Sequence, residues 1–213
     1  MKNRLLPLAV AACSLLAAGA ASAENNVFKL GITDYTTHSR TGGITGIGVP
    51  AGADAQTGDA VTAILVYERM FTPNIGAEVV LGVPPRIKAK ATGSVAFLGD
   101  DILSAKNVAP TFFVNYHVGA PGDTWRPYFG AGVNYTRFVG IKSKLATDVK
   151  MGDSTGLALQ AGIDYALNKD WSLFASVAML KVKTKLVASG STVLQATIDF
   201  RPIVYSFGGV YRF

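Results

Sequence analysis

The sequence has little charge and almost no cysteine. Charged residues make up 16% of the 213 residues and hydrophobic residues 49%, whereas a soluble globular protein carries about 25% charged residues. The single cysteine, Cys13, lies in an N-terminal segment typical of an export signal, so the mature chain is expected to contain none. Disulfides, thiolate catalysis and cysteine metal sites are therefore excluded for the mature chain.

The chain also lacks a long apolar run after residue 23. A membrane-spanning helix needs about 18 or more consecutive apolar residues, and no segment of the mature chain supplies them. The composition nevertheless suits a surface in contact with lipid. Because only helices and closed barrels satisfy every backbone hydrogen bond inside a bilayer, the sequence predicts a transmembrane β-barrel.

The N-terminus has the parts of a bacterial signal peptide. Two basic residues precede an apolar segment, and residues 21–23 form the small-x-small motif that signal peptidase cleaves. We therefore predict a signal peptide over residues 1–23 and one mature domain over residues 24–213, exported to the outer membrane of a Gram-negative bacterium. A lipoprotein site at Cys13 is the alternative, but it would leave a very short apolar segment before the cut.

Alternating positions divide the mature chain into eight segments of the length that crosses an outer membrane. Three short turns, at 72–74, 119–124 and 168–170, alternate with four longer connections, and short turns belong on the periplasmic side. This pattern predicts an eight-stranded antiparallel transmembrane β-barrel. The predicted strands are 27–35, 60–71, 75–90, 108–118, 126–139, 155–167, 171–185 and 192–213.

One face of each predicted strand is apolar and is expected to contact lipid. In the fourth strand Phe112, Val114 and Tyr116 occupy alternate positions, and Leu157 and Leu159 do so in the sixth. A soluble lipocalin-like barrel or sandwich is the alternative, and it would need a polar outward face. The complementary positions are instead mostly small or apolar, which favours the membrane.

The inward positions near the periplasmic ends of the strands are polar or charged. Opposite charges buried inside a barrel must pair, so these residues are expected to form a plug with a structural role. The predicted plug residues are Lys29, Glu68, Glu78, Asn115, His117, Asp164 and Arg212.

Higher in the barrel the inward positions become apolar. They are Ile64, Val66, Val80, Phe113, Ala178, Leu180 and Val204, and Gly82, Gly130 and Gly132 are expected to leave space among them. An eight-stranded barrel has room for its own side chains or one small ligand, so no aqueous channel is expected. A packed dry core and a hydrophobic substrate-binding lumen both remain open. Four apolar residues of the second long connection are expected to shelter the mouth of this lumen: Phe97, Leu98, Ile102 and Leu103.

Three prolines fall at one height on two neighbouring strands. Pro84 and Pro85 lie near the top of the third predicted strand, and Pro110 lies at the same level of the fourth. Because proline cannot donate a hydrogen bond to a β-ladder, the prolines predict either a lateral opening in the wall or simply the ends of the strands.

Basic residues recur at alternate positions near the strand tops. Those that continue a lipid-facing register are Arg137, Lys181, Lys183 and Lys185, and they are expected to contact lipopolysaccharide phosphates. Two further sets do not continue that register: Arg86, Lys88 and Lys90, and Lys142 and Lys144. Solvated hairpins without a partner are the alternative, because exposed charges usually contribute little.

Five stretches carry a resemblance to a known family: 71–78, 126–136, 162–165, 168–171 and 209–213. They resemble the OmpW family of small outer-membrane barrels, and the resemblance covers nearly the whole mature chain. It implies a monomeric barrel with a hydrophobic lumen that admits small apolar molecules from outside and releases them sideways into the membrane. Family members are linked to uptake of hydrocarbons, and some serve as bacteriocin receptors. The C-terminal strand, ending at Phe213, looks like the general signal for the barrel assembly machinery.

Other functional classes find little support. A lipid A-modifying enzyme needs a histidine with a serine and an acid at the outer rim, and His38 in a glycine-rich loop is the sole histidine there. We therefore predict no enzyme, no cofactor, no metal and no nucleic-acid partner. A structural or receptor barrel, whose lumen is filled by its own side chains, remains the main alternative to a channel for small hydrophobic molecules.

Overall fold

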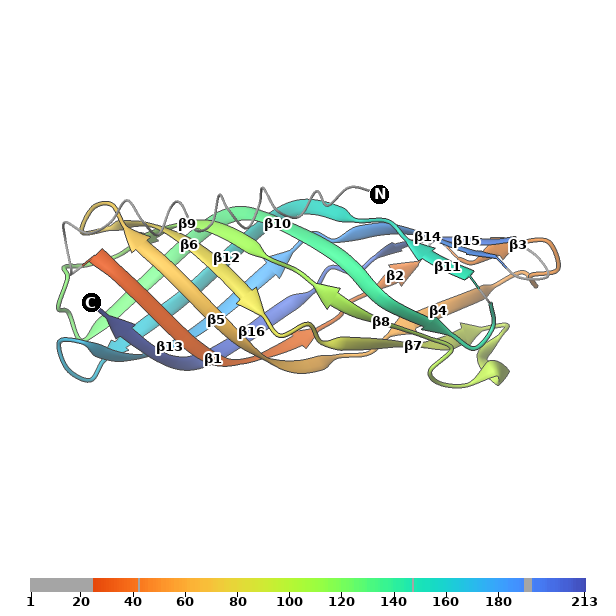
Figure 1. The fold of residues 1–213 in the computed structure, drawn as a ribbon, viewed down its shortest axis with the longest axis horizontal. Helices are drawn as coiled ribbons and strands as arrows, with labels where there is room; N and C mark the ends of the chain where they lie inside the picture. Colours follow the sequence, from red (N-terminus) through yellow and green to blue (C-terminus); the bar gives the residue numbers. More distant parts are fainter. Residues whose placement is uncertain (1–24, 42, 147, 190–192) are drawn as a thin grey trace.

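A computed structural model describes residues 25–41, 43–146, 148–189 and 193–213, and the predicted signal peptide lies outside this part. Eight antiparallel strands form a closed barrel, in which each strand pairs with the next along the chain and the last pairs with the first (Figure 1). The predicted fold is therefore confirmed. The wall consists of β1 (Asn26–Thr36), β5 (Ala60–Met70), β6 (Ile75–Gly82), β9 (Thr111–His117), β10 (Trp125–Ser143), β12 (Ser154–Ala166), β13 (Trp171–Leu180) and β16 (Ile203–Arg212).

A second tier of strands extends the wall on the side of the long connections, at the right of Figure 1. On one side β4 (Ala53–Thr57) pairs with β7 (Arg86–Gly93), which pairs with β8 (Leu103–Val108). On the other, β14 (Lys183–Ser189) pairs with β15 (Val193–Asp199) and β11 (Asp148–Met151), and β15 also pairs with β2 (Arg40–Thr41) and β3 (Thr45–Gly46). A short 3₁₀ turn, η2 (Ala96–Leu98), lies in the β7–β8 connection.

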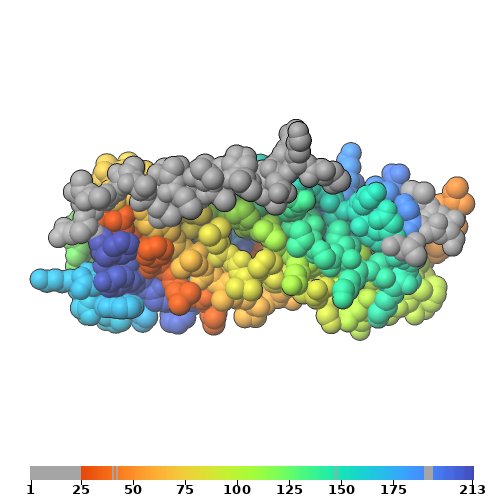
Figure 2. All heavy atoms as spheres, viewed as in Figure 1, coloured from red at the N-terminus to blue at the C-terminus, as the bar shows by residue number. Residues whose placement is uncertain are grey.

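Four predicted strands are interrupted between the two tiers, and this corrects their predicted continuity. Proline explains three of the interruptions, because Pro84, Pro85, Pro110 and Pro202 lie within them and lack a backbone N–H. In Figure 2 the wall is hollowed between the yellow atoms around β6 and β7 and the green atoms of the next strands. By contrast, β10 runs unbroken through both tiers.

The predicted lipid face is exposed or half-buried along the lower tier. The exposed fractions of Leu30, Phe129 and Leu157 are 67%, 59% and 69%, although all three are large and apolar. Aromatic pairs surround the periplasmic end, among them Trp125 with Tyr165, whose ring centroids lie 4.5 Å apart. Such a band is typical of the lipid interface.

None of the described residues forms a helix long and apolar enough to cross a membrane.

Candidate functional site

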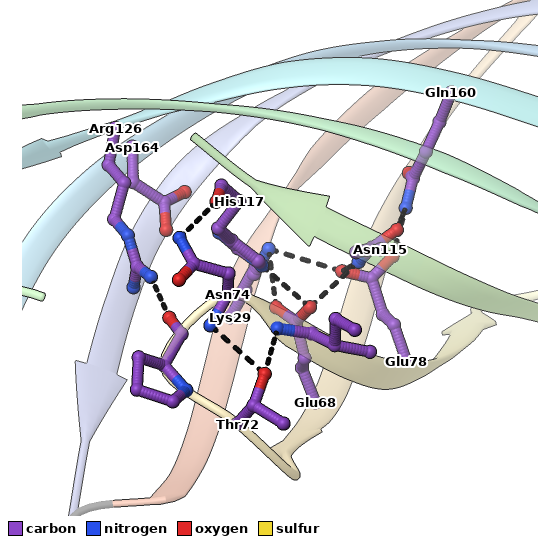
Figure 3. A network of polar contacts seen from close by, with 12 residues as sticks. Lys29, Glu68, Thr72, Asn74, Glu78, Asn115, His117, Arg126, Gln160 and Asp164 are labelled. Carbon is purple, nitrogen blue, oxygen red and sulfur yellow. Dashed lines mark hydrogen bonds and ion pairs between the residues drawn. The ribbon is translucent and has the colours of Figure 1, made fainter. Parts of the chain in front are cut away.

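The lower end of the lumen contains a buried ionic network centred on Lys29. The Lys29 Nζ lies 3.1 Å from Glu78 and 3.3 Å from Glu68, and all three side chains are at most 3% exposed (Figure 3). The ammonium group also lies 4.3 Å from the centroid of the Tyr128 ring, a cation–π contact. Burying these charges is tolerable because each one faces an opposite charge or further polar groups.

Two amide side chains and a histidine complete the network. The Asn115 amide donates to Glu68 at 2.8 Å and to Glu78 at 3.2 Å, and Gln160 donates to Glu78 at 2.8 Å. The His117 Nε2 lies 2.8 Å from Glu68 Oε1, the oxygen that also accepts from Asn115. The network therefore joins strands from more than half of the barrel's circumference.

A second ion pair and a periplasmic turn close the base. Arg212 pairs with Asp164 at 2.8 Å, and Arg126 donates a hydrogen bond to the carbonyl of Pro73. The Asn74 amide donates to the backbone carbonyl of His117 at 2.7 Å. The structure thus places all seven predicted plug residues inside the barrel, in contact with one another or with these neighbours: Lys29, Glu68, Glu78, Asn115, His117, Asp164 and Arg212.

Tyr128 and Gln160 were missed from the sequence, although two glycines mark their places. A Cβ at Gly162 would collide with the Tyr128 ring, and a Cβ at Gly130 would collide with Asn115 and Gln160. The prediction that Gly130 leaves open space is therefore wrong, since the polar network fills it. A glycine opposite a large inward-facing side chain is the sequence signal that could have located Tyr128 and Gln160.

Above the network lies a cavity of about 60 Å³. Two of its polar wall side chains are already paired: Thr111 accepts from Asn134 at 2.7 Å, and Ser206 donates to Thr33 at 3.0 Å. The cavity therefore presents a mainly apolar surface above a polar base. All seven residues predicted for the hydrophobic lumen line it: Ile64, Val66, Val80, Phe113, Ala178, Leu180 and Val204.

A second cavity, of about 100 Å³, lies in the outer tier and was not predicted. We call it the outer chamber, and the lower one the inner cavity. The lining of the outer chamber is almost wholly apolar. It comes partly from predicted strands and partly from segments that were left as connections, among them β4, β8 and β11. Ile102 and Leu103 line the outer chamber as expected of residues that shelter the mouth, but Phe97 and Leu98 are exposed, at 81% and 40%, so that part of the prediction is wrong. Other lining residues are Ile87, Phe138, Leu186, Ile198 and Phe200.

One apolar cluster occupies the space between the two cavities. Phe138 and Phe200 line the outer chamber and stack with ring centroids 5.4 Å apart, while Phe113 and Leu180 line the inner cavity. All four belong to the same buried cluster. The lumen is therefore apolar from the outer tier down to the ionic network.

The wall has a break between β6 and β9. Their ladder ends at the pair Val80 and Thr111, and pairing resumes where the Asn107 N–H donates to the Pro85 carbonyl at 3.0 Å. Within the described chain, no backbone hydrogen bond or ladder pair joins residues 81–84 to 108–110.

Each rim of the break is held by its other neighbour. The Val83 N–H donates to Ala63 on β5 at 2.9 Å, and the Tyr135 N–H donates to Pro110 at 3.0 Å. The rims are therefore fixed while the space between them is unpaired. Val80 and Thr111 below the break line the inner cavity, and Ile87 above it lines the outer chamber, so the break lies between the two cavities.

The four basic residues predicted to meet lipopolysaccharide are all exposed: Arg137, Lys181, Lys183 and Lys185. The expectation that the other two sets do not face outward is wrong, since these residues are exposed too: Arg86, Lys88, Lys90, Lys142 and Lys144. The proline break shifts the alternation by one residue, which buries Ile87 beside Arg86. A bulge between Val139 and Lys142 has the same effect on β10.

Comparison with known proteins identifies relatives along the whole mature chain. The model of the OmpW family matches residues 23–213. Outer membrane protein W of Vibrio cholerae is 37% identical over 152 residues, covering 68% of this chain and 70% of the relative. The dibenzothiophene metabolism operon protein PahQ of Pseudomonas aeruginosa is 33% identical over 144 residues, or 67% of this chain and 64% of the relative.

A solved structure supports the fold. The crystal structure of the outer membrane protein OprG from Pseudomonas aeruginosa superposes with a TM-score of 0.84, covering 90% of this chain and 96% of that one. At 24% identity this likeness speaks for the architecture alone.

Proposed function

Because the chain belongs to the OmpW family of outer-membrane β-barrels, we propose that it is a passive channel for small hydrophobic molecules. The observation that carries the proposal is a continuous apolar lumen that ends on a buried ionic network. A molecule that enters from outside first meets the outer chamber, whose apolar lining offers a better environment than water. The network below blocks passage to the periplasm, so the molecule needs another exit.

The break between β6 and β9 is the exit that we propose. It lies at the level between the two cavities, where residues 81–84 and 108–110 are not hydrogen-bonded to each other. A molecule leaving there enters the apolar part of the bilayer directly. This lateral route needs no aqueous pore, and an eight-stranded barrel has no room for one.

The substrate class follows from the lining and from one relative. A mainly apolar cavity selects molecules that lose little hydration on entry. The relative PahQ takes its name from an operon for the metabolism of dibenzothiophene, a flat apolar ring system. We infer that this chain accepts small apolar molecules, including aromatic ones.

A charged side chain at the lower edge of the break tests whether apolar molecules pass through the lumen. Val80→Asp places a carboxylate at the lower edge of the break and on the inner cavity, and burying an unpaired charge costs several kcal/mol. We expect uptake of an apolar fluorophore by whole cells to fall by about tenfold or more, since each 1.4 kcal/mol is a factor of ten. Val80→Leu is the matched control and should retain uptake. Equal uptake by the Asp variant would contradict transport through the lumen.

A structural or receptor barrel is the second candidate, and the small size of the inner cavity favours it. At roughly 10–15 Å³ for each water, a cavity of about 60 Å³ has room for only about five waters. If the lumen is a packed core, the barrel does not transport the fluorophore. Cells with the wild type or with either Val80 variant then take it up at the same rate as cells without the barrel. The same assay therefore separates the two functions.

We also propose that four exposed basic residues, on β10, on β14 and between β13 and β14, contact lipopolysaccharide phosphates. Each exposed ion pair contributes roughly 0.2–1 kcal/mol, so removing four should weaken lipopolysaccharide binding by about tenfold. The measurement is the amount of lipopolysaccharide that co-purifies with the barrel, and unchanged co-purification would contradict the contacts. The variant carries serine at Arg137, Lys181, Lys183 and Lys185.

A further inference from the structure

Three exposed cations gather directly above the break in the wall, on three adjacent strands. Arg86 begins β7 and is the register partner of Lys106 on β8, and Arg137 follows on β10, where its register partner is Val108. All three side chains are exposed. At about 3.3 Å per residue and about 40° tilt, Arg86 lies roughly 28 Å above Ile75, just beyond the apolar band of a membrane barrel.

No carboxylate of the described chain neutralises these three cations. Arg86 donates a hydrogen bond to the Ser104 hydroxyl at 3.2 Å, and Asp101 of the same hairpin pairs with Lys88 instead. The ion pairs of the described residues include none with Arg86, Lys106 or Arg137. Like charges on directly opposed strand residues destabilise a sheet, so this arrangement calls for an external anion.

The basic residues of β14 differ in this respect. Lys183 has Asp199 as its register partner, and Arg201 pairs with Asp199 at 2.9 Å. Asp199 therefore lies opposite Lys183 on the sheet, whereas the register partners of Arg86 and Arg137 are Lys106 and Val108. The three cations without an acidic register partner lie directly above the break between β6 and β9.

The surface below the three cations is apolar and faces lipid. Leu81 and Val83 on one rim of the break are 49% and 63% exposed, and Phe112 on the other rim is 41% exposed. A ligand that fits both levels carries several anionic oxygens at its head and hydrocarbon chains beneath. In the outer leaflet of the outer membrane, a phosphorylated glycolipid has this chemistry.

We propose that Arg86, Lys106 and Arg137 bind the phosphate groups of a lipopolysaccharide molecule whose acyl chains lie across the break and cover it. Each guanidinium group can donate hydrogen bonds to two phosphate oxygens at once. The Lys106 ammonium group adds a third positive charge. The acyl chains close the wall where the strands are not hydrogen-bonded to each other. A substrate that leaves sideways through the break displaces these acyl chains. This last consequence rests on the proposed lateral exit, whereas the binding site itself does not.

Binding is tested on the purified full-length barrel, without any transported substrate. The site variant carries Arg86→Ser, Lys106→Ser and Arg137→Ser, and the matched control carries Lys88→Ser, Lys142→Ser and Lys144→Ser, which removes the same charge further from the break. Each protein is titrated with purified lipopolysaccharide in detergent. We expect the site variant to bind at least about tenfold more weakly, with the control within about twofold of the wild type.

Two further arms decide the identity of the ligand. Dephosphorylated lipopolysaccharide should bind the wild type as weakly as the site variant binds the intact lipid, and millimolar inorganic phosphate should not displace the lipid. Equal weakening in the site and control variants, or displacement by inorganic phosphate, would overturn the proposal. If the triple variant does not assemble, Lys106→Ser alone relieves the repulsion with Arg86 and should still weaken binding. Because no arm measures uptake, failure of the lateral exit leaves this result unaffected.

Discussion

Replacing Lys29 with methionine is expected to lower the free energy of unfolding of the barrel by about 3–5 kcal/mol, the usual cost of removing one partner from a buried ion pair. Lys29 lies within 3.3 Å of both Glu68 and Glu78, so its loss leaves two carboxylates facing each other in a site shielded from water. Methionine fills a similar volume, which separates the loss of charge from the loss of packing. Urea unfolding in lipid vesicles gives the measurement.

Two comparisons make this result specific. Adding Glu68→Gln and Glu78→Gln to the Lys29→Met variant removes the stranded charges and should recover much of the lost stability. Lys88→Met breaks an exposed pair with Asp101, whose partners are 58% and 43% exposed, and should cost less than about 1 kcal/mol. A Lys29→Met barrel that unfolds like the wild type would show that the network does not hold the base together.

The alternation of side chains predicted the lower tier because lipid imposes one rule on every strand. Large apolar side chains such as Leu30, Phe129 and Leu157 face outward because they are in contact with lipid. Lys29 and Glu68 face inward because a charged side chain is unfavourable in the apolar part of the bilayer. The inward register also grouped the seven residues that line the inner cavity. Period-two reasoning therefore held wherever the strands run without interruption.

The outer tier could not be predicted because its pairing joins distant segments and its register shifts. β4 pairs with β7 across about thirty residues of sequence, and no local pattern indicates that contact. At the proline break the alternation changes by one residue, so Arg86 faces outward although strict alternation from Val80 pointed it inward. A one-residue shift moves every later side chain to the opposite face. The cations above the break were hidden by this shift.

The candidate site was predicted from the sequence except for Tyr128 and Gln160. Lys29 and Glu78 stand out because a charge inside a barrel needs a partner. Tyr128 and Gln160 carry no such signal, since either residue also occurs on an interfacial or solvated face. Their positions depend on the space above Gly162 and Gly130, which only the paired register of β10 and β12 reveals.

Closing the break is expected to abolish most uptake of apolar substrates while leaving the barrel assembled. Valine at Pro84 and Pro110 and threonine at Pro85 restore three backbone N–H donors and favour strand pairing. Residues 81–84 can then form ladder bonds with 108–110, which are not joined in the native wall. Uptake of an apolar fluorophore by whole cells should approach the rate of cells that lack the barrel.

The control for this variant is Pro121→Val, which changes an exposed proline in a periplasmic turn far from the break. It should transport like the wild type. Restored ladder bonds should also slow amide hydrogen exchange at the new donors, which shows whether the break has closed independently of uptake. Slowed exchange with unchanged uptake would exclude the break as the exit, and the substrate would then have to leave by another route through a lumen whose base is occupied by Lys29, Glu68 and Glu78.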